Sequence, residues 1–463
     1  MAMMKGFSNA FKIPELRKKI LITLGLVFVC RLIAQIPTPG VDWHALQRAV
    51  DDIRAAQAAS GGNALFGWFD VFTGGALSSF SVGTLSIWPY ISAQIVIQLL
   101  SSIIPSLQKM RKEGENGRQQ LAQITRYLTI FLCVIQAWAL ATSICNPQML
   151  GFSEGTTFVG APGLGFHVMT VIAMTAASLF VMWLADQITT FGIGNGASLI
   201  IMLNITSRLP AAIQSAYNKY LKETTDPMGL VLIVIFFVIV VIGTVMLTQG
   251  VRKIAIHSTR RSLVGGATYG MQQTYMPLRV NYTGVMPIIF AQPLLQIVAA
   301  LCKWVSNGEG ILGRVSTYLQ PPYSATDPVA AYVIIYGALI VFFTFFWVAT
   351  QFNAVEISES FKKDGSYVPG IRPGYATAEY LDDVMTKITL IGALGLLVLA
   401  ILPLVIQSRM GVPAAIASFF GGTSLLIIVG VALDTLRVME SHLLVRKYKG
   451  FLSHGSLRGR GGM

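Results

Sequence analysis

Charged residues are scarce in this sequence. Lys, Arg, Asp and Glu together make up 12% of its 463 residues, whereas 54% of the residues are hydrophobic. A soluble domain carries about 25% charged residues. This deficit excludes an ordinary soluble enzyme, and the long apolar runs indicate a polytopic membrane protein. Unbroken runs favour membrane-spanning helices, because a barrel needs short segments of alternating polarity.

Motifs for catalysis and metal binding are also missing. The sequence has no G-x-x-x-x-G-K-[ST] phosphate loop, no H-E-x-x-H motif and no cluster among its five histidines. Its four cysteines show no C-x-x-C spacing and are expected to pack as small apolar side chains. The apolar runs contain few ionisable residues, which ion-coupled pumps need. These absences favour a passive conduit without metal or cofactor, and not an enzyme.

Apolar windows of about 20 residues predict the membrane spans. The windows predict ten helices, which begin near Ile20, Val82, Leu121, Phe166, Ile193, Gly229, Gly284, Val329, Ile388 and Ala414. If the N-terminus is inside, 25 of the 34 Lys and Arg residues fall in inner segments. The positive-inside rule then places both termini in the cytoplasm. The expected fold is therefore all-α, with ten transmembrane helices.

Two short repeated motifs divide the chain into halves, residues 1–218 and 219–463, with five predicted spans each. The skeleton Pro-x-Ile-x-Ala-Gln begins at Pro89 and again at Pro287, and the Gly196 stretch resembles the Gly422 stretch. An odd number of spans per half makes the halves run in opposite directions, as in inverted repeats. This symmetry pairs isoleucines of the two halves: Ile91 with Ile289, and Ile201 with Ile427. Either they converge on a central axis, or they face lipid or core.

A short apolar segment, residues 65–76, precedes the first of these prolines, and Gly74 and Gly75 end it. It is too short to cross a membrane. It is expected either to re-enter the membrane from the outer side or to lie on the outer surface, and Asp70 favours a water-filled cavity. Both prolines are expected to bend or begin a helix, because proline lacks a backbone N–H.

Two long basic loops, residues 249–281 and 351–387, are expected on the cytoplasmic side. Long loops are often functional. In the second loop, the run VPGIRPG holds Arg372 between two Pro/Gly turns. That arrangement suits the presentation of one cation to a partner. The run GIGNGAS, by contrast, has no preceding strand and is interpreted as a tight turn or a close helix approach.

Several motifs in this order resemble the bacterial-type SecY family, over roughly residues 11–450. They are VPGIRPG, GIGNGAS, FGGTSLLI, the stretch Phe72–Leu77, WPYISA and PLRVN. The resemblance implies a protein-conducting channel in the bacterial cytoplasmic (inner) membrane. Such a channel translocates unfolded secretory polypeptides and releases apolar segments through a lateral gate into the lipid bilayer.

The resemblance also implies roles for individual residues. The pore ring would comprise Ile87, Ile91, Ala197, Ile201, Ile289 and Ile427. The plug, residues 65–76, would include Leu65, Phe66, Phe69, Asp70, Val71, Phe72, Gly74 and Gly75. Contacts with a motor or ribosome would come from Arg372, Arg252, Lys253, Arg260, Arg261, Lys362 and Lys363. The chain departs from the family at Ala197, where a larger aliphatic residue is common, and at residues 265–268, where relatives often carry basic residues.

A channel without a nucleotide site must take work from a partner. The resemblance implies a SecA-type ATPase or a translating ribosome as the driver, small SecE-type and SecG-type membrane subunits, and signal peptides and nascent or unfolded polypeptides as substrates. A secondary transporter with inverted repeats is an alternative, disfavoured by the scarce intramembrane charge and the basic loops. A non-conducting membrane scaffold would leave the paired prolines and isoleucines unexplained.

Overall fold

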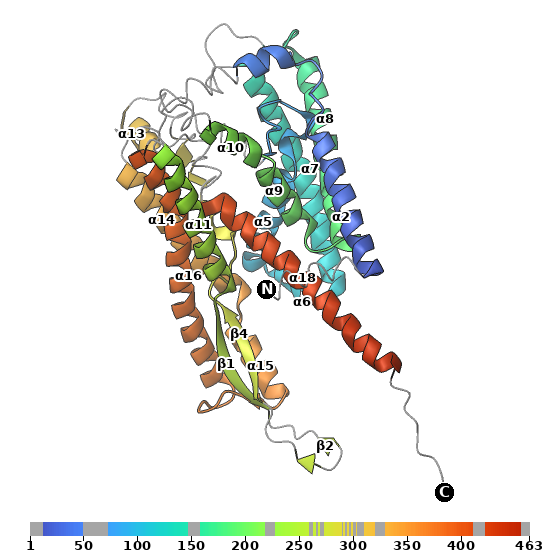
Figure 1. Cartoon of the computed structure of the whole chain (residues 1–463), viewed down its shortest axis with the longest axis vertical. Helices are drawn as coiled ribbons and strands as arrows, with labels where there is room; N and C mark the ends of the chain where they lie inside the picture. The colour runs from blue at the N-terminus through green and yellow to red at the C-terminus, as the bar shows by residue number, and fades with distance from the viewer. Residues whose placement is uncertain are drawn as a thin grey trace. The chain divides into compact units, whose positions relative to one another are not determined.

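The structure is a computed structural model. It describes residues 13–49, 73–146, 158–217, 227–258, 263–264, 267–268, 273–288, 290–291, 294–295, 298–299, 302, 310–319, 329–410 and 422–454. The chain forms two compact units. The first comprises residues 1–59, 66–211 and 431–463, and the second residues 60–65 and 212–430. Each unit is described separately below (Figure 1).

The first unit is helical. Its elements are α2 (Pro14–Ile33), the 3-10 helix η1 (Val82–Leu85), α5 (Trp88–Ile103), α6 (Pro105–Lys112), α7 (Glu115–Cys145), α8 (Leu164–Phe191) and α9 (Gly196–Thr206), followed by α10 (Leu209–Tyr217), which crosses the unit boundary. Helix α8 packs against α2, α7, α9 and η1, and α2, α7 and α8 run side by side in Figure 1. It is therefore the central helix of this unit.

Small residues allow α7 and α8 to approach closely. The buried positions of α7 follow every third or fourth residue: Thr125, Thr129, Cys133, Ala137, Ala141 and Ile144. Short side chains at such spacing bring helix backbones close together, which is how helices associate in membranes. Next to Thr125, Arg126 of α7 forms an ion pair with Asp186 of α8 at 2.8 Å.

The second unit has a helical part and a small sheet. Its helices are α11 (Pro227–Gln249), α13 (Gly310–Tyr318), α14 (Val329–Gln351), α15 (Ala354–Lys363), α16 (Tyr375–Met410) and the start of α18 (Gly422–His454). Its core draws buried residues from α11, α14, α16 and α18, such as Val240, Ile340, Leu396 and Leu426. The strands are β1 (Val251–Ser258), β2 (Leu263–Val264), β3 (Ala267–Thr268), β4 (Gln273–Arg279) and β5 (Ser366–Tyr367).

Both expected loops contain regular structure. The three-stranded sheet has the order β4-β1-β5, with antiparallel pairs, so one strand from the second loop joins the hairpin of the first. Helix α16 already begins at Tyr375, inside the second expected loop, residues 351–387. The helix extends because Leu381, Val384 and Met385 pack in a core shared with Ile254 of β1. Figure 1 shows β1, β4 and α15 together at the lower end of α14 and α16.

Within the described residues, six helical segments are long and apolar enough to cross a membrane. They are Val82–Ser101, Glu115–Cys145, Leu164–Phe191, Gly196–Gln214, Ala331–Lys363 and Tyr375–Leu402. Windows expected near Gly284 and Ala414 fall partly outside the described residues. The helical membrane fold is confirmed, and the count of ten spans stays a prediction.

Candidate functional site

The backbone between Gly74 and Ser86 is held from several helices of the first unit; we call these residues the anchor segment. Gly74 and Gly75 have φ values of +67° and +94°, a region in which side chains are strained. Both Nη atoms of Arg31, in the last turn of α2, donate to the Gly74 carbonyl oxygen at 3.3 Å. Ser207 donates to the same oxygen at 3.3 Å, so one carbonyl accepts from two elements.

A second arginine holds the next turn of the anchor segment. The Nη2 atom of Arg208 donates to the Ser78 hydroxyl at 3.0 Å. A Cβ atom on Gly75 would lie 2.8 Å from the Arg208 guanidinium carbon, so a side chain there would displace the guanidinium as well as strain the backbone. Thr84 closes the segment on itself by donating to the Ala76 carbonyl at 3.0 Å.

The far end of the anchor segment carries backbone strain. Phe80 and Ser86 have φ values of +42° and +45°, which are uncommon for residues other than glycine. The Phe80 carbonyl accepts the Thr38 hydroxyl at 2.7 Å, and the Ser86 carbonyl accepts the Ser178 hydroxyl at 2.9 Å. Asn204, 5% exposed, donates from Nδ2 to the Ser86 hydroxyl at 3.0 Å. Strained residues persist only where their surroundings hold them.

Most of the predicted plug lies outside the described residues. Leu65, Phe66, Phe69, Asp70, Val71 and Phe72 are in that part of the chain. Gly74 and Gly75 are described and belong to the anchor segment. The role predicted for residues 65–76 therefore stays a prediction.

The predicted pore-ring residues divide between the two units. In the first unit, Ile87 is the N-cap of α5 and 2% exposed, and Ile91 is 7% exposed one turn later. Ala197 and Ile201 are half-buried in α9. In the second unit, Ile427 is 2% exposed near the start of α18, and Ile289 lies outside the described residues. Each described member lies in the first turns of its helix or just before it.

Both predicted helix-breaking prolines lie near helix starts. Pro89 is in the first turn of α5, where its missing N–H removes no helical hydrogen bond. Pro287 is buried and helical, two residues after Val285, where the turn at Gly284 and Val285 ends.

The GIGNGAS run is confirmed as a close helix approach. A Cβ atom on Gly196 would collide with the carbonyl oxygen of Ala185 in α8. Asn195 caps α9 by accepting from the Ser198 N–H at 3.3 Å, and the Gly196 N–H donates to the Thr189 hydroxyl at 2.9 Å. This packing places Ala197 directly after the contact between α8 and α9.

The sheet of the second unit carries both buried apolar residues and exposed basic ones. Ile254, Ile256 and Leu278 are buried, whereas Arg252 and Lys253 are exposed at the start of β1. Arg260 and Arg261 lie outside the described residues. Lys362 and Lys363 are exposed in the last turn of α15, where cations favourably meet the helix dipole.

Arg372 is exposed, in a turn whose backbone is held by hydrogen bonds. The Ile371 N–H donates to the Val368 carbonyl at 3.2 Å, and Ile371 packs against the core beneath the sheet. The Thr377 hydroxyl donates to the Arg372 carbonyl at 2.9 Å, and the Ser358 hydroxyl donates to the Gly374 carbonyl at 2.9 Å. The turn backbone is thus fixed while the guanidinium faces solvent.

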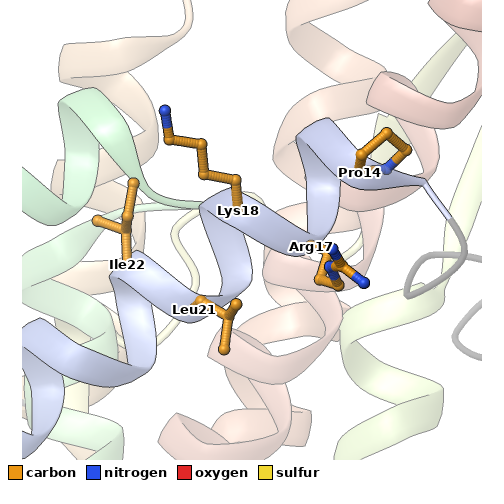
Figure 2. Close-up of a pocket in the computed structure, with 5 residues that line it drawn as sticks. All are labelled: Pro14, Arg17, Lys18, Leu21 and Ile22. Carbon is orange, nitrogen blue, oxygen red and sulfur yellow. The ribbon is translucent and has the colours of Figure 1, made fainter.

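A hollow of about 520 Å³ lies at the N-terminal end of α2 (Figure 2). Its described lining consists of Pro14, Arg17, Lys18, Leu21 and Ile22. Figure 2 shows the Lys18 and Arg17 side chains pointing to different sides of the helix. Two cations next to apolar side chains suit the boundary between membrane and cytoplasm, where long basic side chains extend to water.

Two features of these sites could not be or were not predicted from the sequence. Arg31, Arg208 and the serines and threonines that hold the anchor segment carry no local signal, because their partners are distant in sequence. Strand β1 was not predicted, although the alternation of Lys253, Ile254, Ala255 and Ile256 is a strand signal.

Comparisons with known proteins agree with this architecture. The SecY family model matches residues 81–436. The protein translocase subunit SecY of Thermotoga maritima is 40% identical, with 99% of this chain and all of the relative covered. That of Streptomyces coelicolor is also 40% identical, over 97% of this chain and all of the relative.

Solved structures show the same fold at low identity. A protein-conducting channel aligns with a TM-score of 0.60 and 17% identity, covering 92% of this chain and 93% of that one. Sec61 in the canine ribosome–channel complex from the endoplasmic reticulum aligns with a TM-score of 0.57 and 16% identity, covering 92% and 93%. Together with the family match and the relatives at 40% identity, this fold shows that the chain belongs to the SecY family.

Proposed function

We propose that this chain is the central protein-conducting subunit of a translocase in the bacterial cytoplasmic membrane, with both termini in the cytoplasm. The observation that carries this proposal is similarity along nearly the whole chain to proteins named protein translocase subunit SecY. The proposed organisation is two inverted halves of five spans each, residues 1–218 and 219–463.

The proposed pore constriction is a ring of apolar side chains. Its members are Ile87, Ile91, Ala197, Ile201, Ile289 and Ile427. A narrow apolar constriction expels water and so blocks ions. It also offers a passing polypeptide no fixed hydrogen-bond partner, so polar and apolar side chains can both slide through. The small side chain of Ala197 makes the seal depend more on the plug, residues 65–76.

Sorting between export and membrane insertion follows from transfer energy. A segment of about 20 apolar residues gains free energy by leaving sideways into lipid. A charged residue at the bilayer centre costs about 2.5–3.5 kcal/mol on insertion scales. Polar chain therefore crosses the membrane, and apolar chain leaves through a lateral gate.

The proposed drivers dock on the basic loops of the second unit. The support is a cluster of exposed cations, Arg252, Lys253, Lys362, Lys363 and Arg372, on a structured sheet and turn. A structured platform loses less entropy on binding than a free loop does. A SecA-type ATPase or a ribosome would supply the work, with SecE-type and SecG-type subunits completing the complex; Arg260 and Arg261 would extend the contact.

Reconstitution tests the proposal. The purified chain, with SecE-type and SecG-type partners, is placed in liposomes with a SecA-type ATPase, ATP and a signal-bearing preprotein. We expect the preprotein to become protected from external protease only when ATP is present. If a parallel channel of known activity protects the preprotein and this chain does not, the channel proposal fails. The transporter alternative would then predict uptake of a small solute by the same liposomes.

A further inference from the structure

The anchor segment is held at the Gly74 carbonyl by Arg31 and at the Ser78 hydroxyl by Arg208, and the proposed pore, plug and docking surfaces use neither arginine. Arg31 lies on α2 and Arg208 lies between α9 and α10, so the two come from helices distant in sequence. Both belong to the first unit, as does the anchor segment. Their hydrogen bonds span 43 and 130 residues of sequence, which makes them tertiary contacts and not local caps.

An arginine side chain is well suited to this contact. Its planar guanidinium carries five donors in a fixed fork. Arg31 directs two of them at a single carbonyl oxygen, and Arg208 reaches Ser78 on the following turn. Hydrogen bonds with one charged partner are roughly twice as strong as neutral ones. Both arginines are half-buried, and these hydrogen bonds fix the position of the anchor segment.

The anchor segment also contains strained backbone, at Phe80 and Ser86, which Thr38, Ser178 and Asn204 hold. Four residues of the segment have positive φ, namely Gly74, Gly75, Phe80 and Ser86, and two of these are not glycines. Such conformations persist only when the surrounding structure fixes them, and they concentrate where proteins switch. The segment also joins the predicted plug to Ile87, the first predicted ring residue.

We propose that Arg31 and Arg208 are positioning residues for the resting channel: by fixing the anchor segment they set how tightly the channel is sealed before a substrate arrives. This inference rests on the proposed function. Arg31 carries more of the effect, because its hydrogen bonds reach the backbone carbonyl of the glycine pair, whereas Arg208 bonds the Ser78 side chain.

The test measures ion conductance of the complete complex in planar bilayers without substrate. Arg31→Gln is expected to raise the resting conductance about tenfold, equivalent to ~1.4 kcal/mol, with Arg208→Gln giving a smaller rise. Arg31→Lys keeps the charge but not the fork, so it should fall between wild type and Arg31→Gln. Arg48→Gln is the matched control, because Arg48 is exposed and bonds only the His44 carbonyl of its own helix.

Folding and function are separated by further measurements. If Arg31→Gln does not assemble, Ser207→Ala removes one donor at the Gly74 carbonyl, together with the bond of the same hydroxyl to the Asn204 carbonyl at 2.7 Å. It should still raise the conductance measurably above that of Arg48→Gln. Equal conductance of wild type, Ser207→Ala and the arginine variants would overturn the inference. That failure is distinct from failure of the proposed function, because wild type would still protect a preprotein in the ATP-dependent assay.

Discussion

Two turns in this molecule combine positive-φ glycines with an arginine, and they use the arginine in opposite ways. At Gly74, the carbonyl accepts from Arg31, so the cation points into the protein and fixes the backbone. At Gly374, with φ +109°, the carbonyl accepts from Ser358, and Arg372 is left exposed. Hydroxyl groups hold the second turn, which frees its guanidinium for a partner.

The difference shows that an arginine between glycines does not by itself indicate a binding site. Whether the arginine is available to a partner depends on which group donates hydrogen bonds to the carbonyl oxygens of the turn. Where neutral hydroxyls do so, the cation is available, and its interaction depends on a partner outside the chain. Where the cation does so, its removal releases the turn that it holds. The two turns should therefore respond differently to charge and to backbone substitutions.

The largest effect is expected at the exposed turn. Arg372→Glu should lower ATPase-driven translocation more than tenfold, a loss of over ~1.4 kcal/mol, because it places a like charge where an acidic partner surface is expected. Thermal unfolding should be unaffected, since the side chain is exposed. The measurement is the rate of preprotein protection, with Arg372→Lys as the milder variant. A stably expressed Arg372→Glu channel with normal export would remove this residue from the docking surface.

A deletion of residues 65–72 tests the plug apart from the anchor segment. It should raise the resting conductance, because the plug is removed, and leave translocation active. Arg31 and Ser207 still hold Gly74, so the anchor segment keeps its contacts. Single-channel recordings without substrate provide the measurement. A resting conductance identical to that of wild type would count against a plug in this part of the chain.

Gly374→Ala separates backbone conformation from packing at the exposed turn. An added methyl group meets no neighbour within 4 Å, but φ is +109°, so the change costs about 1–3 kcal/mol of strain. We expect a several-fold loss of translocation from mispositioning of Arg372. Gly25→Ala is the matched control, because that glycine is helical, its φ is ordinary and its surroundings are equally open. Equal activity of the two variants would show that the turn need not be rigid.

Asn204→Ala weakens the far end of the anchor segment. It removes the hydrogen bond to the half-buried Ser86 hydroxyl, a net loss of about 0.5–1.5 kcal/mol. The expected result is a lower unfolding temperature of the complex and a modest rise in resting conductance. Thr206→Ala, two positions away, loses only an exposed bond to its own helix and serves as the control. If both variants unfold at the same temperature as wild type, Asn204 does not stabilise the anchor segment.

The smallest effect is expected for a surface ion pair. Lys387 and Asp383 are 2.7 Å apart, with side chains 68% and 57% exposed. Pairs of this kind contribute about 0–1 kcal/mol. Asp383→Asn should therefore leave unfolding and translocation close to wild type. A large loss of translocation would show that the charge of Asp383 in α16 contributes more to partner binding than the exposed turn around Arg372 does.

Much of the fold could be predicted from local sequence. The spans that became α7 and α8 are long apolar runs, and a membrane requires such runs to be helical. Pro89 marked the start of α5 because proline suits the first helical turn. The turn around Arg372 could be predicted because the prolines and glycines that restrict its backbone are adjacent to Arg372 in the sequence.

The anchor segment could not be predicted in this way. Its contacts join Arg31 to Gly74 and Asn204 to Ser86, and nothing in the local sequence around either partner indicates the other. The positive φ values of Phe80 and Ser86 are imposed by tertiary hydrogen bonds against their own preference. The paired isoleucines were found only because the sequence repeats, and their convergence on one axis remains a prediction.

The most direct test of the central claim is a cross-link between a translocating chain and the proposed ring. A preprotein with one cysteine is arrested during ATP-driven translocation through cysteine-free channels carrying Ile91→Cys, Ile201→Cys or Ile427→Cys. Phe131→Cys, on the exposed face of α7 with 62% of that side chain exposed, is the control. Disulfides at all three ring positions and not at residue 131 are predicted. Cross-links at residue 131 alone, or at none of the four, would contradict a pore lined by these isoleucines.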